Sequence, residues 1–180
     1  AHLDAKGGTP GALDNAAGVV VLLLLAELLV GYEGQLGIEI VALNGEDHYS
    51  AAGEIRYLNS HAQGLPGVML GINIDAAGYH KGDTAYSLYA CSEEIEAAIM
   101  KTISARQGMI EGQPWYQSDH SLFIQNNRPA MAFTSERFME LTTDITHTAK
   151  DRPELVDPSR LADIAVALWD LVLELDKTTS

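Results

Sequence analysis

The feature that most constrains the fold of this chain is an apolar run that ends in carboxylates, and it occurs twice. Residues 38–43 form a largely apolar run, and Glu46 and Asp47 follow it after Asn44 and Gly45. A second run begins at residue 68 and ends in Asp75. Open α/β sheets bind their ligands at the carboxyl ends of strands. The pattern therefore predicts two buried strands that deliver negative charge to one edge of a sheet.

Glu46 and Asp47 are adjacent, and two neighbouring carboxylates can perform two different tasks. If Asp47 binds a metal ion while Glu46 stays free to move protons, the pair forms a hydrolytic centre. This interpretation requires further ligands to converge on the same place.

The rest of the chain alternates between strand patterns and helix patterns. Strands are expected at residues 38–43, 68–75, 84–89 and 130–134, and helices at residues 14–30, 50–58, 92–106 and 157–176. Residues 1–13, 107–117 and 135–157 are expected to be loops. This alternation predicts an α/β fold with three layers, α-β-α, around a mostly parallel central sheet. No linker or repeat divides residues 1–180, so we expect one domain.

Charge and cysteine content exclude several classes of function. Eleven Lys and Arg stand against 25 Asp and Glu, giving a net charge of −14, and no basic cluster occurs. Such a chain repels phosphate backbones and anionic lipid, so we expect neither nucleic acid nor membrane as a partner. Cys91 is the only cysteine, which excludes an intrachain disulfide and a zinc site with several thiolates.

The apolar run at residues 18–26 is too short to span a bilayer, and Glu27 interrupts it, so it predicts a buried helix. We expect a soluble chain with no transmembrane segment and no signal peptide, while the compartment and oligomeric state are not indicated. The opening residues lack a strand leading into them. The chain therefore either begins abruptly or is cut from a longer protein.

Five nitrogen or oxygen donors occupy strand ends or the loops that follow strands: His2, Asp14, Asp47, Asp75 and His147. Imidazole and carboxylate ligands without thiolates suit zinc, and also manganese or cobalt. Five ligands exceed what one tetrahedral ion with an open position needs. Shared between two ions, with one carboxylate bridging, they leave room for a water molecule.

Two of these donors also have simpler interpretations. His2 precedes Asp4 in a His-x-Asp pair, in which the imidazole can bind metal while the carboxylate orients a neighbouring ligand or the imidazole itself. Such a pair also arises by chance on surfaces. Asp14 stands where a helix N-cap is expected, and a plain cap is the alternative to a bridging ligand.

Six short motifs carry a resemblance to a known family. They are His2-Leu-Asp4, Gly11-Ala-Leu-Asp14-Asn15-Ala-Ala-Gly18, Gly45-Glu46-Asp47, Asn73-Ile-Asp75, Ser118-Asp119-His120 and His147-Thr-Ala-Lys-Asp151. In order and approximate spacing they resemble the co-catalytic di-zinc aminopeptidases of peptidase clan MH. That family includes bacterial leucyl aminopeptidases, with glutamate carboxypeptidase II and glutaminyl cyclase as relatives.

The resemblance implies a phosphorylase/hydrolase-like zinc exopeptidase fold and a set of metal ligands. Asp14 would bridge two zinc ions. His2 and Asp75 would complete one site, while Asp47 and His147 would complete the other. The family more often has Glu where Asp47 stands, and the shorter side chain is expected to shift or weaken that site.

The same resemblance implies roles for residues beside the metals. Glu46 would be the general base and acid, and Asp4 would support catalysis as a partner of His2. Asp119 and His120 match a motif that borders the substrate site, and Tyr116 is a candidate to hold the oxyanion. His48, His61, His80, Glu136 and Glu140 match no motif and are expected on the surface or at the pocket rim.

The expected function is that of a zinc-dependent aminopeptidase acting on peptides or small amides. The alternatives are a carboxypeptidase, another amide hydrolase or a one-zinc cyclase of the same fold, and a non-catalytic module. The family also has strands and a helix before its His-x-Asp motif. Residues 1–180 are thus expected to be a zinc peptidase catalytic domain truncated at its N-terminus, and such a piece could be catalytically incompetent.

Overall fold

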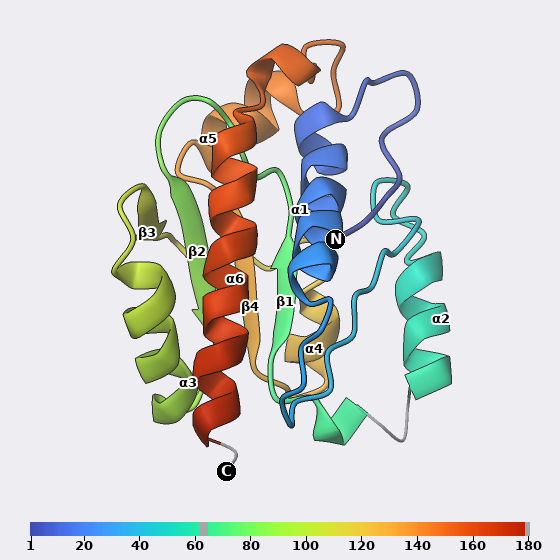
Figure 1. Ribbon diagram of the computed structural model, residues 1–180. Coiled ribbons are helices and arrows are strands. Elements are labelled where there is room, and N and C mark those ends of the chain that lie inside the picture. Colours follow the sequence, from blue (N-terminus) through green and yellow to red (C-terminus); the bar gives the residue numbers. More distant parts are fainter. Residues whose placement is uncertain (62–64, 179–180) are drawn as a thin grey trace.

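A four-stranded mixed sheet forms the middle of the protein (Figure 1), as a computed structural model describing residues 1–61 and 65–178 shows. The strands are β1 (Gly71–Ile74), β2 (Thr84–Tyr89), β3 (Met109–Glu111) and β4 (Ala130–Ser135), in the order β1-β4-β2-β3. β1 pairs with β4 and β2 with β3 in parallel, while β2 and β4 are antiparallel. The α/β class is confirmed, and the sheet is parallel in two of its three pairings.

Helices cover both faces of this sheet. In Figure 1, α1 (Ala17–Leu28), α3 (Glu93–Ile99) and α6 (Pro158–Thr178) lie in front, and α4 (Ser121–Gln125) lies behind. The remaining helices are α2 (Ala52–His61) and α5 (Phe138–Glu140). Short helical segments complete the chain: η1 (Ala12–Ala16), η2 (Leu65–Gly67), η3 (Met100–Ser104), η4 (Leu141–Ile145) and η5 (Pro153–Leu155).

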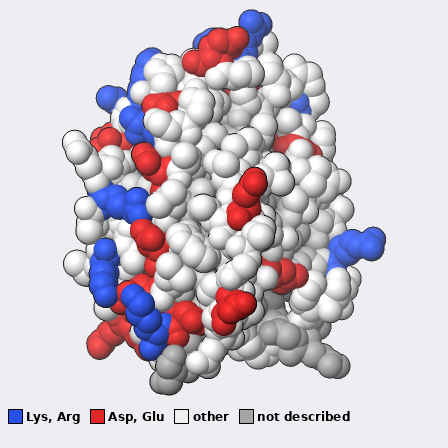
Figure 2. All heavy atoms as spheres, in the orientation of Figure 1, with Lys and Arg blue, Asp and Glu red and all other residues white. Residues whose placement is uncertain are grey.

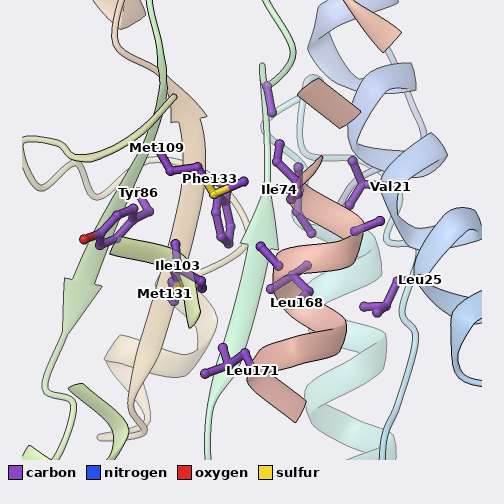
Figure 3. Packing of buried hydrophobic residues seen from close by; sticks show 14 of the residues in the cluster. Val21, Leu25, Ile74, Tyr86, Ile103, Met109, Met131, Phe133, Leu168 and Leu171 are labelled. Carbon is purple, nitrogen blue, oxygen red and sulfur yellow. The ribbon is translucent and has the colours of Figure 1, made fainter. Parts of the chain in front are cut away.

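The central strand β4 divides its side chains between two hydrophobic clusters. Met131 and Phe133 pack in the cluster formed with the front helices, and Ala130 and Ala132 pack behind the sheet against Trp115. This division follows from the alternation of side chains along a strand. Figure 3 shows the front cluster, which also includes residues of β1, α1 and α6. All six residues of β4 are buried, as a central strand covered on both faces requires.

The prediction of a strand at residues 38–43 is wrong. Among the described residues this run makes a single β-bridge, between Leu43 and His2. An apolar groove of about 460 Å³, lined by Val41 and Met69 among others, lies between the run and the edge of β1. A strand needs a neighbour that satisfies its backbone groups. The sequence pattern identified the apolar run but could not indicate whether a neighbouring strand pairs with it.

The expected helix at residues 14–30 begins later, because Asp14 is not its cap. Asp14 and Asn15 have non-helical backbone angles, and α1 begins at Ala17. Instead, Asn15 Oδ1 accepts a hydrogen bond from the Gly18 backbone N–H at 3.1 Å. That contact is the one expected of a capping residue.

The other elements agree with the sequence to different degrees. The ranges of β2, β4 and α6 are close to those expected, and Ser92 caps α3 by accepting from the Ile95 N–H. β3 lies where a loop was expected, and α5, η4 and η5 lie within residues 135–157. These elements are too short to display a recognisable period.

The face formed by α1, α3 and α6 carries scattered charges. Figure 2 shows acidic side chains dispersed over this face, with Lys and Arg mostly on the left and fewer charges on the right. α1 exposes apolar side chains here, including Leu23, which is 65% exposed. Even so, no helix within the described residues has both the length and the apolarity needed to cross a membrane.

Asp157 caps α6, and its removal should destabilise the fold. Its Oδ1 accepts hydrogen bonds from Ser159 Oγ at 2.7 Å and from the Ser159 N–H at 3.0 Å, which hold the pKa of Asp157 below its usual range. We expect Asp157→Ala to lower the free energy of unfolding by about 0.5–1 kcal/mol in urea at pH 7, since the side chain is partly exposed. Asp157→Asn keeps a hydrogen-bond acceptor, so it should lower the free energy of unfolding by less.

The pH dependence gives this prediction a second test. Because the folded pKa of Asp157 is lowered, its contribution is present above the ordinary pKa of a carboxyl group and is lost as pH falls through the lowered value. The difference between wild type and Asp157→Ala should therefore shrink in acid. A difference that stays constant with pH would contradict the ionised cap.

Candidate metal centre

The five predicted donors lie together at one edge of the sheet. Asp75 directly follows β1, and Asp14 lies in the turn before α1. His2 bridges to Leu43, which brings it beside the loop that carries Asp47. His147 follows η4.

His2, Asp14 and Asp75 form the first group of donors, and all three are buried. His2 Nε2 lies 3.3 Å from Asp14 Oδ1 and 3.6 Å from Asp75 Oδ1. The other ring nitrogen, Nδ1, donates to the backbone carbonyl of Asp4 at 3.1 Å. Because Nδ1 donates here, Nε2 is the ring nitrogen that faces the carboxylates and that could bind a metal ion after losing its proton.

Asp14, Asp47 and His147 form the second group. His147 Nε2 lies 2.7 Å from Asp47 Oδ1 and 3.1 Å from Asp14 Oδ2. The short side chain of Asp47 therefore reaches its partner. Asp14 directs one oxygen at each histidine, so it stands between the two groups, as a bridging ligand must.

These residues fit metal ions on chemical and geometric grounds. Donors bound at about 2.0 Å to one tetrahedral ion are about 3.3 Å apart, and the four separations between histidine nitrogens and carboxylate oxygens range from 2.7 to 3.6 Å. His2 Nε2 and Asp47 Oδ2 are buried and have no hydrogen-bond partner among the described residues. A buried polar atom without a partner is costly, and a cation in contact with it would remove that cost.

Burial and the neighbouring carboxylates change the pKa values in the cluster. Burial acts to lower the pKa of His2, but the nearby carboxylates of Asp14 and Asp75 outweigh it and raise that pKa to about 12. Burial, followed by the charge of Asp75, raises the pKa of Glu46 to about 8. Burial likewise raises the pKa of Asp14. The cluster therefore retains protons at neutral pH, where a divalent cation would compete with them.

Glu46 lies next to the first group without belonging to it. Its Oε2 is 3.8 Å from His2 Nε2, and its side chain is 22% exposed. Asp4 helps to place this loop, because its Oδ1 accepts a hydrogen bond from the Gly45 N–H at 2.8 Å. The Asp4 carboxylate is 3.7 Å from His2 Nδ1, too far for a hydrogen bond. Asp4 thus contacts His2 through its carbonyl and the Glu46 loop through its carboxylate.

His120 and Asp119 are buried in the wall behind the cluster. His120 is fully buried; its Nε2 donates to the Trp115 carbonyl at 2.8 Å, and Nδ1 faces the Asn73 amide at 3.5 Å. Burial lowers the pKa of His120, which favours the neutral ring. Asp119 is 4% exposed, and burial raises its pKa. Both nitrogens of His120 face protein groups, so this ring supports the wall.

Tyr116 occupies a different environment. Its side chain is 63% exposed and packs edge-on against Tyr89, with ring centroids 5.4 Å apart. No contact in the described part of the chain connects it to the five donors, and its role stays a prediction. His48 is exposed, as expected.

Sequence reasoning assigned no role to two residues that contact the Asp14 turn. Asp151 accepts hydrogen bonds from the backbone of Leu13 and Asp14, and Asn15 donates to the carbonyl of Ile74. Both residues occur within the quoted motifs. Their position in those motifs was the available signal, but the contacts themselves depend on the fold.

Comparison with known proteins identifies the family. The family described as Peptidase family M28 matches residues 1–172. The chain belongs to peptidase family M28. Among curated proteins no relative matches this M28 chain.

Solved structures share the fold of this M28 chain. An aminopeptidase from Aneurinibacillus sp. strain AM-1 aligns with a TM-score of 0.79 and 21% identity, over 96% of this chain and 42% of its own. BSAP, a zinc aminopeptidase from Bacillus subtilis, aligns with a TM-score of 0.79 and 21% identity, over 97% of this chain and 44% of its own. The LapA aminopeptidase of Legionella pneumophila aligns with a TM-score of 0.79 and 16% identity, over 97% of this chain and 49% of its own. The M28 chain thus spans less than half the length of these proteins.

Zinc binding should release protons from this centre. Glu46 holds its proton below about pH 8 in the metal-free protein, and a cation nearby favours the charged carboxylate, so zinc affinity should rise between pH 6 and 8. Isothermal titration calorimetry in buffers with different ionisation enthalpies measures the released protons. An affinity independent of pH, with no buffer dependence of the heat, would contradict the proton-retaining cluster.

Proposed function

We propose that this chain is the catalytic domain of a zinc-dependent aminopeptidase, which removes N-terminal residues from peptides. The carrying observation is that Asp14 directs its two oxygens toward two separate histidines, each accompanied by a further carboxylate. Such a set of donors suits two ions that share one ligand. Membership of family M28 supports the peptidase part of the proposal.

Each ion would have its own donors. His2, Asp14 and Asp75 would hold one ion, and Asp14, Asp47 and His147 would hold the other. Manganese and cobalt suit the same nitrogen and oxygen ligands as zinc. When bound, such ions polarise the scissile carbonyl and lower the pKa of a water molecule.

Glu46 would carry the proton. Its carboxylate stands beside the first group at 3.8 Å from His2 Nε2 and is held there through the contact of Asp4 with Gly45. In this position Glu46 can accept the proton of the attacking water and then donate it to the departing amine. A carboxylate bound by metal on both oxygens would lose this freedom, which explains why the centre needs Glu46 in addition to its ligands.

The surroundings favour a cationic group on the substrate. After burial, the charges of Asp75 and Asp119 also raise the pKa of Glu46, and the charge of Asp75 raises that of Asp119, so these carboxylates lie close together. A free α-amino group would be attracted to such a region, consistent with cleavage at the N-terminus. We propose that Asp119 and His120 border the substrate and that Tyr116 approaches the oxyanion.

Glu46→Gln should abolish most of the activity without removing the metal. The amide keeps the size of the side chain but cannot accept the water's proton, so kcat should fall by about 10²- to 10⁴-fold. Hydrolysis of an aminoacyl-nitroanilide measures the rate, and elemental analysis should find about two zinc ions per chain. Glu93→Gln, an exposed counterpart on α3, should change neither quantity.

The substrate tests separate the proposal from its alternatives. An N-acetylated nitroanilide should not be cleaved, because it lacks the free amine. Cleavage of the blocked substrate, or release of a C-terminal residue, would indicate another amide hydrolase or a carboxypeptidase. Two bound zinc ions without any hydrolysis would contradict the catalytic part of the proposal.

A further inference from the structure

The turn that carries Asp14 is held by a different neighbouring side chain on each side. Asp151 connects the turn to the loop that contains His147, and Asn15 connects it to the strand that ends in Asp75. These two segments supply ligands to different halves of the candidate metal centre. Building on the two-metal centre proposed above, the two contacts can be assigned separate tasks.

Asp151 accepts hydrogen bonds from three successive backbone amides of the turn. Its Oδ1 receives the Leu13 N–H at 2.7 Å, its Oδ2 receives the Asp14 N–H at 3.1 Å, and its carbonyl receives the Ala12 N–H at 3.4 Å. The carboxylate is 1% exposed, so water does not compete for these bonds. A buried carboxylate that accepts two backbone amides binds the turn with charge-assisted hydrogen bonds.

The loop from residue 145 to Asp151 is itself fixed by local hydrogen bonds. Thr148 Oγ1 donates to the Ile145 carbonyl at 2.7 Å and accepts from the Lys150 N–H at 3.1 Å. Asp151 also donates its own N–H to the Thr148 carbonyl at 3.3 Å. His147 lies inside this loop, so holding Asp151 against the Asp14 turn also fixes the separation of Asp14 from His147.

Asn15 performs the corresponding task on the other side. Its Nδ2 donates to the Ile74 carbonyl at 2.8 Å, one residue before Asp75, and its Oδ1 accepts from the Gly18 N–H at 3.1 Å. Asn15 is 1% exposed. A side-chain carbon on Gly18 would lie 2.4 Å from Asn15 Oδ1 and 2.5 Å from the Ile74 carbonyl oxygen, which indicates how closely Gly18 approaches the Asn15 side chain and the backbone of β1.

We propose that Asp151 and Asn15 are positioning residues that set the two halves of the metal centre independently. Asp151 fixes Asp14 relative to His147, and Asn15 fixes Asp14 relative to Asp75. Partners that orient metal ligands contribute roughly 10- to 100-fold to metal affinity. Loss of either contact should therefore weaken the half that it serves and leave the other half nearly intact.

Two isosteric substitutions test this division. Asp151→Asn keeps one acceptor but turns an N–H group toward a backbone N–H, so one of the two bonds to the turn is lost. Asn15→Asp keeps the acceptor for Gly18 but places an oxygen against the Ile74 carbonyl in place of the donor. Asp144→Asn, on the exposed surface of η4, is the matched control.

Nitrogen-15 spectra of the histidine side chains, recorded during a zinc titration, report each half directly through His2 and His147. In Asp151→Asn, the His147 signal should need about 10- to 100-fold more zinc than in wild type, while His2 responds as before. In Asn15→Asp the pattern should be reversed. Asp144→Asn should titrate like wild type.

The pattern also separates positioning from charge. Asp151→Asn removes a negative charge and Asn15→Asp adds one, so a purely electrostatic effect would weaken both sites in the first variant and strengthen both in the second. Either of those outcomes, or equal weakening of both sites in one variant, would overturn the proposal.

Amide hydrogen exchange of the metal-free protein tests the contacts without any ligand. In wild type the Leu13 and Asp14 amides should be protected, and in Asp151→Asn they should exchange faster while the Gly18 amide stays unchanged. Wild-type amides that exchange like an open loop would overturn the inference even if zinc binds. If wild type binds no zinc but the exchange pattern holds, the two-metal function fails while Asp151 remains the anchor of the turn.

Discussion

The repulsion among buried carboxylates is the constraint on which the rest of this structure depends. Asp14, Asp47 and Asp75 are each at most 8% exposed, and Glu46 is beside them. Bringing like charges out of water is unfavourable unless cations or protons compensate them. The remainder of the fold must supply the stability that holds them together, and the cluster of β4 with the front helices is the largest source. The parallel pairing of β1 with β4 aligns Ile74, the residue before Asp75, with Phe133, and both side chains belong to this cluster.

More of the candidate site than of the surrounding fold could be predicted from the sequence. His2, Asp14, Asp47, Asp75 and His147 were recognisable because metal chemistry restricts which side chains can serve. Their order along the chain then restricted the family. The strand β2 and the helix α6 were also predictable, since each displays a regular period with a clear boundary. Residue type and local periodicity can both be read from the sequence without knowledge of distant contacts.

What the sequence could not indicate depends on partners that are distant along the chain. The run at residues 38–43 has the composition of a strand, but pairing needs a neighbour, and the described residues provide one only at Leu43. Asp14 was a candidate helix cap because no neighbouring residue indicated that the distant Asp151 accepts hydrogen bonds from the backbone amides of this turn. Asp4 was expected to orient either a neighbouring ligand or His2 itself, and its carboxylate accepts the N–H of Gly45, in the loop that carries Glu46 and Asp47. Each of these outcomes depends on residues that are distant along the chain.

The separation of the two histidines along the chain has a further consequence. His2 and His147 belong to opposite ends of the sequence, yet both contact Asp14. Ions held at this place would join the first residues to a loop near the last helix, and the intervening chain would become a closed loop. Closure of a long loop restricts the unfolded chain, much as a disulfide does. The metal centre would then be a reversible cross-link between distant parts of this chain, whose single cysteine, Cys91, cannot form a disulfide within it.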